Sequence, residues 1–429
     1  MKLRHVPFLV WLTGLAAFAA ANANFEVFGF SASGYAWVLP LVVALLVLAR
    51  HPNRVKFPWP IWVPWALLLV VYLVEADDAH ALQRTAMMLC PVVVGMAASC
   101  SRLTPVTPRE TRRFLRVLAI AVGLGIVWHA GLLISGTLPV YGGSATSVMT
   151  ASLLAAMFAT GYSFGRRTDL GWWVAIQLVP WIALTRTGIV ASAVTLPFCF
   201  GPLKVRTRLI SLGAIALGSV ALFSTPRMQA RMFYSGSGTL SEISLQNRNF
   251  ATSGRSALWP ELLEEIKSKP WVGHGANASE TFISATRPDL AHPHNDWLRL
   301  LFDYGILGTG FFVITFIAQG LHALAAARRA PDFARLLFLS CALSFVVLFV
   351  FMCTDNIILY AAFFGNLLFA LLGLAYGSVG RRKNGRALAG SFETHGLPER
   401  SARTNDKRRG EPGTADAYPW TLPRPGGTS

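Results

Sequence analysis

The chain has 429 residues, of which 53% are apolar and only 14% are charged. A soluble domain carries about 25% charged residues, so this composition, with a mean hydropathy of +0.48, excludes most soluble folds and favours a protein embedded in a bilayer. The formal net charge of +17 would also suit a nucleic-acid-binding protein, so the positions of the basic residues must decide between these interpretations.

Runs of about 20 mostly apolar residues are long enough to cross the hydrocarbon layer as helices. The sequence contains about twelve such runs and therefore predicts an all-α integral membrane protein. The first run follows Lys2, Arg4 and His5, as in a signal peptide, but more apolar runs follow, so we expect an uncleaved helix. The seventh and eighth runs are short enough to be one broken span. The runs lie near residues 6–22, 34–49, 59–74, 82–99, 114–134, 147–164, 170–185, 188–202, 208–223, 299–326, 333–353 and 356–378.

Lysine and arginine are concentrated in every second connection between these runs and in the C-terminal segment. Because short cytoplasmic loops carry the excess of basic residues, this alternation predicts that both termini are cytoplasmic. The positive charge is then mostly a topology signal, and we expect no nucleic-acid partner. The basic connections lie at residues 2–4, 50–56, 102–116, 166–167, 204–208 and 328–335.

The apolar runs divide the chain into four parts. Residues 1–223 form an N-terminal transmembrane bundle of about nine spans, and residues 299–378 add about three more. Between them, residues 224–298 form a large outer loop, where function tends to concentrate. Residues 379–429, rich in Gly, Pro, Lys and Arg, are expected to be a disordered cytoplasmic tail.

The loop itself contains one helical pattern, from residue 256 to residue 270. Ser256 is placed to cap this helix, Pro260 falls in its first turns, and Pro270 ends it. The five cysteines of the chain show neither CxxC nor Cys/His ligand spacing. We therefore expect neither a disulfide framework nor a zinc site.

The segment 291–310, AHPHNDWLRLLFDYGILGTG, contains the most specific candidate residue. Pro293 suits a helix start, and counting by three and four from His294 reaches Gly305 and Gly308, where a neighbouring helix could approach closely. A helix N-terminus disfavours imidazolium, so we expect His294 to stay neutral and to accept a proton near neutral pH. The alternative is a histidine that only ends a helix and bonds the loop backbone.

Three stretches resemble one family. His-Asn at 294–295, nine intervening residues and Gly-Ile-Leu-Gly-Thr at 305–309 resemble the His-Asn-x9-Gly-x-x-Gly-Thr signature of the bacterial O-antigen ligase family, which is similar to the lipid-linked glycan polymerases. Thr-Arg-Thr-Gly at 185–188 resembles the family's Arg followed by a small residue. Ser-Gly-Arg at 253–255, then Leu-Trp, Pro270, and glycines at 273 and 275, resembles the pattern of its periplasmic loop.

The resemblance implies an enzyme of the bacterial inner membrane with a periplasmic active site. Its donor would be a glycan on undecaprenyl diphosphate, held by Arg186 and Arg255, because guanidinium groups form bidentate contacts with phosphate oxygens. His294 would act as general base in a direct, inverting displacement. Two alternatives stay open: Arg186 could instead extend to the membrane interface, and Arg255 could be a solvated residue or a partner of Glu261.

Other polar residues near these motifs are weaker candidates, for which a structural or solvated role is the simpler interpretation. A glycine turn, for example, explains His274 as well as a donor site does. We see no clustered carboxylates near the loop that would bind Mg²⁺, so we expect metal-independent chemistry and no cofactor. The weaker candidates are Asn295, Arg248, Arg287, His292, Asp296 and His274.

Three alternative functions remain to be compared: a ligase, a polymerase and a transporter. Ligation of O-antigen to lipid A core is favoured because the His-Asn spacing is matched without a gap; polymerisation of a growing glycan would use the same donor. A polysaccharide-precursor transporter or flippase is suggested by about twelve spans alone. Coupled carriers place ionisable groups near the bilayer midplane, whereas several acidic residues of this chain fall at the ends of predicted spans, namely Glu26, Glu75, Asp77, Asp78, Asp169 and Asp355.

Overall fold

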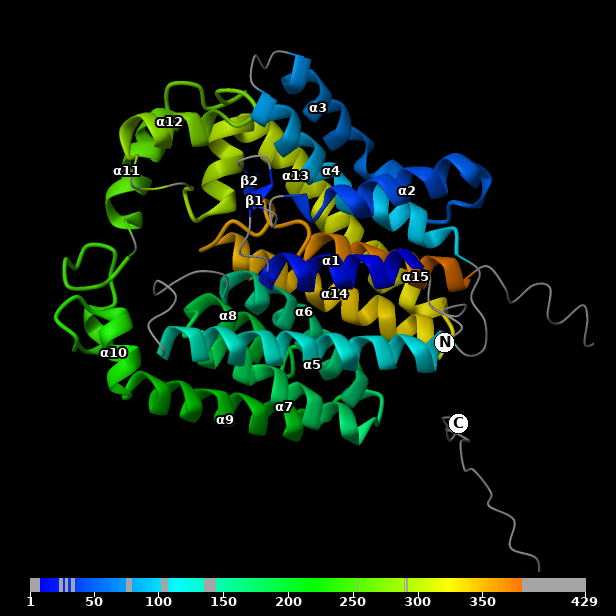
Figure 1. The fold of residues 1–429 in the computed structure, drawn as a ribbon, viewed down its shortest axis with the longest axis horizontal. Helices are drawn as coiled ribbons and strands as arrows, with labels where there is room; N and C mark the ends of the chain where they lie inside the picture. The colour runs from blue at the N-terminus through cyan, green and yellow to red at the C-terminus, as the bar shows by residue number, and fades with distance from the viewer. Residues whose placement is uncertain are drawn as a thin grey trace, which may run out of the picture. The chain divides into compact units, whose positions relative to one another are not determined.

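The computed structural model describes residues 8–22, 26–27, 30–31, 35–74, 79–101, 107–134, 144–252, 254–288, 290 and 292–379. Its regular secondary structure in the described part is helical except for one short antiparallel pair, β1 (Glu26–Val27) and β2 (Phe30–Ser31), and an isolated bridge between Phe233 and Phe250. The predicted all-α class is confirmed (Figure 1). The predicted tail beyond residue 379, Lys2, Arg4, His5, Ser253, Glu75, Asp77 and Asp78 lie outside the described residues.

Each predicted apolar run overlaps a helix. In the described part of the chain, six helices are long and apolar enough to cross a membrane, namely α4 (Ala79–Ser99), α5 (Thr107–Ile134), α6 (Ser144–Ser163), α9 (Val205–Phe223), α13 (Asp296–Arg329) and α14 (Asp332–Met352). Shorter helices occupy the other runs, so the number of spans stays a prediction. They are α1 (Phe8–Asn22), α2 (Val38–Arg50), α3 (Val63–Val74), α7 (Arg167–Ile182), α8 (Arg186–Ala193) and α15 (Gly365–Val379).

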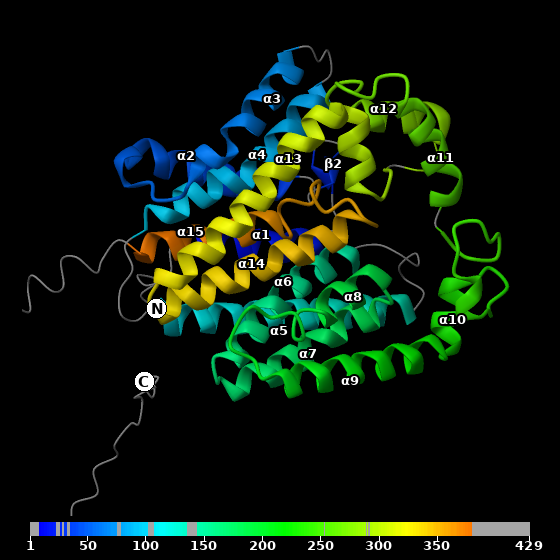
Figure 2. The same ribbon diagram turned by 180° about the vertical axis from the view of Figure 1, so that it is seen from behind.

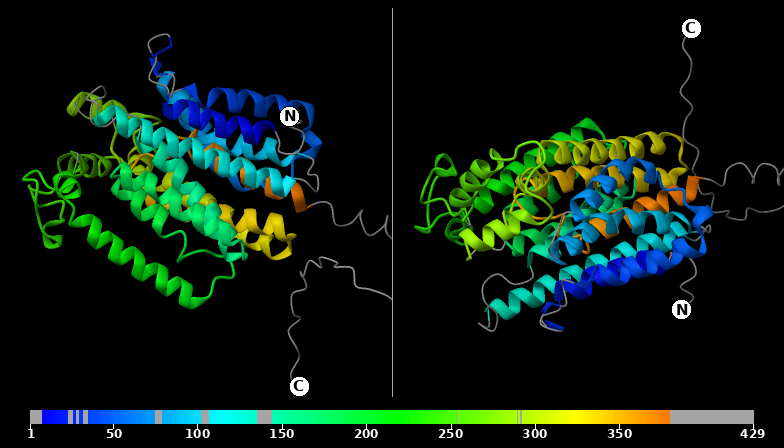
Figure 3. Two further views of the ribbon diagram at one scale, coloured as in Figure 1. Left: turned by 60° about the horizontal axis from the view of Figure 1, so that its bottom comes forward. Right: turned by 90° about the horizontal axis from the view of Figure 1, so that it is seen from above.

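The bundle has a buried centre and a loosely attached edge. Within the most apolar window of α6, 83% is buried, whereas for α9 the share is 6%, and α9 runs along the edge of the bundle in Figure 3. Helices α13 and α14 pack side by side (Figure 2). Helix α4 packs closely against α15. The two backbones are so near that a Cβ atom on Gly373 would overlap the carbonyl oxygen of Gly95.

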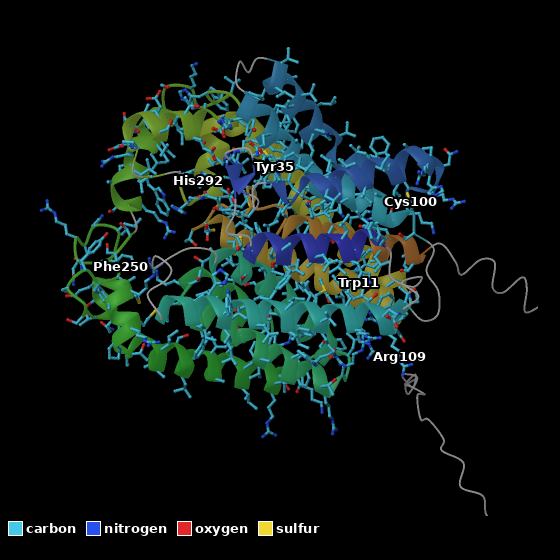
Figure 4. The ribbon with its side chains drawn as sticks, viewed as in Figure 1. Trp11, Tyr35, Cys100, Arg109, Phe250 and His292 are labelled. Carbon is cyan, nitrogen blue, oxygen red and sulfur yellow. The ribbon has the colours of Figure 1, made fainter. Side chains whose placement is uncertain are left out.

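The large loop between α9 and α13 carries three short α-helices, α10 (Pro226–Met232), α11 (Arg255–Ile266) and α12 (Ala278–Thr286), and the 3-10 helix η4 (Leu240–Glu242). They lie at one end of the bundle, and the label of Arg109 marks the opposite end in Figure 4. The predicted cap at Ser256 is wrong. Helix α11 begins at Arg255 after left-handed Gly254, and the Ser256 hydroxyl bonds Thr252.

The predicted start of the last span, at residue 356, is also wrong. Residues 353–364 form turns, and α15 begins at Gly365. The cause is a competing acceptor: the backbone N–H of Ile358 donates to the buried carboxylate of Asp296 at 2.9 Å. Polar side chains therefore hold this apolar stretch outside a helix, at the end of the bundle that carries α11 and α12 (Figure 1).

Candidate active site

Arg186 lies where the two short apolar helices meet. Helix α7 ends at Ile182, Leu184 has a left-handed backbone with φ of 49°, and α8 begins at Arg186. The guanidinium donates through Nη2 to the carbonyl oxygen of Ala251 at 3.0 Å and lies 5.2 Å from the centre of the Phe250 ring. Arg186 is therefore directed onto the segment that precedes α11.

Arg255 is the first residue of α11 and follows Gly254, whose φ of 80° suits glycine. Its Nη2 donates to the carbonyl oxygen of Thr354 at 2.8 Å. The alternative in which Arg255 pairs with Glu261 is wrong, because Arg287 holds that carboxylate at 2.6 Å.

The electrostatic surroundings of Arg255 suit an anionic ligand. Burial lowers the pKa of Arg255; the carboxylate of Asp355 opposes this change, and the neighbouring cation of Arg231 adds to it. The Nε atom of Arg255 is also buried and has no hydrogen-bond partner among the described residues. Positive charge thus gathers around Arg255.

His294 stands just before α13, not on it, so the predicted helix start at this residue is wrong. Asn295 is the N-cap: its Oδ1 accepts from the backbone N–H groups of Trp297 and Leu298 at 3.0 and 3.1 Å. His294 itself has a left-handed backbone with φ of 52°, which is uncommon and costly for a residue other than glycine. The His294 side chain is therefore attached to a turn whose backbone is held in place by the Asn295 cap.

Two polar side chains face the Nδ1 atom of His294. The Oδ1 atom of Asp355 lies 3.8 Å away, and the Nδ2 atom of Asn356 lies 3.4 Å away. The His294 side chain is 36% exposed and that of Asp355 15%. The imidazole therefore has a carboxylate on one side and stays accessible to a substrate.

The turn at Thr354–Asn356 joins the three predicted segments. The Thr354 hydroxyl pairs with that of Thr187, next to Arg186, while the Thr354 carbonyl accepts from Arg255. The next two residues of the turn face His294. The polar triplet Thr-Asp-Asn between two apolar runs is a sequence signal for this turn, but not for its contacts with the three segments.

Helix α13 is interrupted at Gly305, and the loop binds to the backbone groups that this break leaves free. Gly305 has φ of 62° and ψ of −169°, so the helix is interrupted there. The segment 270–275 fills the gap: Pro270 and Trp271 accept from the N–H groups of residues 306 and 307, and residues 274 and 275 donate to the carbonyls of residues 302 and 303.

Gly305 and Gly308 of α13 are both expected to allow a close helix contact, but they face different neighbours. A Cβ atom on Gly305 would overlap the carbonyl of Trp271, so the close neighbour is loop backbone and the predicted helix contact is wrong here. At Gly308 a Cβ atom would lie 3.0 Å from Leu68 of α3, as expected for a helix neighbour. The Pro-x-x-Gly-x-Gly stretch therefore docks the loop onto α13.

Where the loop meets the bundle there is a charge cluster centred on Glu280 of α12. Its carboxylate is 2.7 Å from Arg84 of α4, 3.1 Å from His292 and 3.3 Å from Arg299 of α13, and Arg299 also lies 3.5 Å from Asp303. Burial by itself raises the pKa of Glu280, but the close contact with His292 and the charges of Arg299 and Arg84 lower this pKa to about 2. The cluster fastens α12 to α4 and α13.

Other weaker candidates take different places. His274 stacks on Phe302 with the ring centres 4.6 Å apart, and its Nε2 lies 3.2 Å from the Glu265 carbonyl oxygen. Arg248 is exposed in the loop before α11. Among the described residues, no three His, Cys, Asp or Glu side chains are grouped so that they could hold a metal ion.

The comparisons with known proteins agree with the resemblance of the motifs. Residues 130–313 match the family model described as O-antigen ligase, a family of glycan-transferring ligases and polymerases that act on lipid-linked glycans. No individual curated protein matches the chain. The matched range includes Arg186, Arg255 and His294, while Asp355 lies beyond it. Between residues 130 and 313 the chain is therefore similar to the O-antigen ligase family.

Proposed function

We propose that the protein is a glycosyltransferase of the bacterial inner membrane. It transfers an O-antigen glycan from undecaprenyl diphosphate to a sugar hydroxyl of lipid A core on the periplasmic side, with both termini of the chain in the cytoplasm. The observation that carries the proposal is the Thr354–Asn356 turn, which contacts Arg255, His294 and the neighbour of Arg186. One basic nitrogen and two guanidinium groups, distant in sequence, are linked by this single turn.

The two arginines bind the donor diphosphate. A guanidinium has five N–H donors, and the structure uses one from each of Arg186 and Arg255 for a backbone carbonyl. Further donors remain for phosphate oxygens, to which charge-assisted bonds are about twice as strong as neutral ones. As the sugar leaves, negative charge builds on the diphosphate, and fixed guanidinium groups stabilise it.

His294 takes the proton of the acceptor. The acceptor oxygen attacks the anomeric carbon, the bond from that carbon to the diphosphate breaks, and the hydroxyl proton moves to Nε2 of His294. The Asp355 carboxylate, 3.8 Å from Nδ1, stabilises the imidazolium that forms, as carboxylates do beside catalytic histidines. A single displacement inverts the anomeric centre. Because the arginines supply the positive charge, the reaction is expected to proceed without a metal ion.

The test replaces Arg186, Arg255 and His294 singly by alanine in cells that lack the wild-type protein. We expect each variant to lose surface glycan at normal protein levels, since each removes a donor contact or the base. Arg227→Ala is the control, because Arg227 is an exposed arginine of α10 in the same loop. Normal surface glycan in all three variants would rule the proposal out.

The products that accumulate separate the ligase from a polymerase. Cells without a ligase accumulate lipid-linked polymer and bare core, whereas cells without a polymerase show core carrying a single repeat unit. Reconstitution with undecaprenyl-diphosphate glycan and rough lipopolysaccharide gives the same distinction in vitro, because only a ligase joins the glycan to core. The spacing of the His-Asn motif favours the first result.

A further inference from the structure

Four arginines lie on the first turns of α5, far from the candidate active site. Arg109, Arg112, Arg113 and Arg116 line a groove of about 520 Å³ between α5 and α7. Arg109 and Arg113 are exposed, and Arg112 and Arg116 are half-buried. Figure 4 places Arg109 at the end of the bundle opposite the loop that carries His292 and Phe250. We call the cavity lined by these arginines the α5 groove.

The rest of the α5 groove is apolar. Val117 and Ile120 continue the same side of α5, and Trp172 closes the groove from α7. Further along α5, Leu124 and Trp128 are 65% and 66% exposed and follow at helical spacing. The helix thus presents a charged end and, one turn further, an apolar stripe, which is the division found in a phospholipid.

The charges of the α5 groove are poorly neutralised within the protein. In the described part of the chain the ion pair of this cluster is Arg116 with Asp169, at 3.3 Å, and the buried Nε atoms of Arg112 and Arg116 have no hydrogen-bond partner there. Burial and the cations of Arg112 and Arg116 lower the pKa of nearby Arg166, which Asp169 opposes. Arg116 and Arg166 therefore share the carboxylate of Asp169.

We infer that the α5 groove binds an anionic membrane phospholipid, with its phosphate among the four arginines and its acyl chains along Val117 and Ile120. Basic pockets between membrane helices on the cytoplasmic side suit such headgroups, and the residues 102–116 belong to a predicted cytoplasmic connection. A small phosphate would use the arginines but leave the apolar wall exposed. The inference does not depend on the glycan-transfer proposal, because the groove and the candidate active site lie at opposite ends.

The experiment measures lipid binding to the purified full-length protein by native mass spectrometry. Phosphatidylglycerol is the probe, and phosphatidylcholine and glycerol phosphate are the comparisons. The test variant is Arg109→Gln with Arg113→Gln, since both side chains are exposed. The control is Arg328→Gln with Arg329→Gln, which removes two exposed charges at the end of α13.

We expect the test variant to bind phosphatidylglycerol about thirtyfold more weakly than the wild type, because each basic residue near an anionic surface contributes about fivefold. The control should bind almost as the wild type does, and phosphatidylcholine and glycerol phosphate should bind weakly to both. The inference is overturned if both double variants lose binding equally, if the test variant binds normally, or if either comparison ligand binds as tightly as phosphatidylglycerol. The single variant Arg113→Gln repeats the test if the double variant does not fold.

Discussion

Replacing Glu280 by glutamine removes the charge at the centre of the cluster that joins α12 to α4 and α13. The carboxylate faces Arg84, His292 and Arg299 at 2.7, 3.1 and 3.3 Å, and the Arg299 side chain is fully buried. A glutamine of similar size keeps the packing but removes the carboxylate that faces Arg84 and Arg299, while Arg299 keeps its contact with Asp303. The change therefore tests whether ionic contacts hold α12 against α4 and α13.

The size of the effect follows from the pKa of Glu280. Although burial opposes it, the contact with His292 and the two arginines lower this pKa from 4.5 to about 2, and each unit corresponds to about 1.36 kcal/mol. The carboxylate side chain is only 14% exposed, so solvent screens it little. We expect Glu280→Gln to lower the free energy of unfolding by about 3 kcal/mol, at the lower end of the range for breaking a buried ion pair.

Unfolding by sodium dodecyl sulfate in mixed micelles, followed across pH, is the assay. Because the folded pKa of Glu280 lies below the unfolded one, its contribution is complete above about pH 4.5. It is lost as the pH falls toward 2, so wild type and Glu280→Gln should converge there. Glu264→Gln is the control, since its pair with Lys267 is largely exposed and worth about 0.5 kcal/mol. Equal effects of the two substitutions at pH 7 would refute the reasoning.

Three further outcomes follow from the site. Gly305→Ala should lower the free energy of unfolding by about 2 kcal/mol or more in the same assay, because a Cβ atom would overlap the carbonyl of Trp271 at a left-handed backbone. Asp355→Asn should lower the rate of glycan transfer in vitro about a hundredfold, and Asp355→Glu should recover part of it; unchanged rates would exclude a role beside His294. Transfer should continue in excess EDTA, and a loss that Mg²⁺ restores would contradict a diphosphate site built from arginine alone.

The sequence predicts the helices well because their cause is local. A long apolar run must satisfy its backbone polar groups internally in a bilayer, so composition alone indicates where helices form. The break between α7 and α8 can also be predicted from the sequence, since Arg186 lies between two short apolar runs. The position of the last helix cannot be predicted in the same way, because residues 357–364 are mostly apolar and yet are held in turns by the carboxylate of Asp296.

Two features of the candidate site depend on contacts between distant segments. The apolar spacing around Gly305 stays helical in sequence, so periodicity cannot reveal that segment 270–275 supplies the missing hydrogen bonds. The same holds for Asp355, which a charge count places only at the end of a span. Its position near His294 depends on the fold of the turn before α15, and no motif in the matched family range contains it.

The backbone explains how three distant side chains can share one site. Leu184, Gly254 and His294 have left-handed φ values of 49°, 80° and 52°, and each candidate residue is one of these or lies within two positions of one. Such conformations cost about 1–3 kcal/mol for residues other than glycine and persist where surrounding contacts fix them. Here the contacts come from the Thr354–Asn356 turn and the Asn295 cap. In the proposed transfer reaction, a His294 side chain held in this way would reorient little, which favours the transition state because the reacting groups are already ordered.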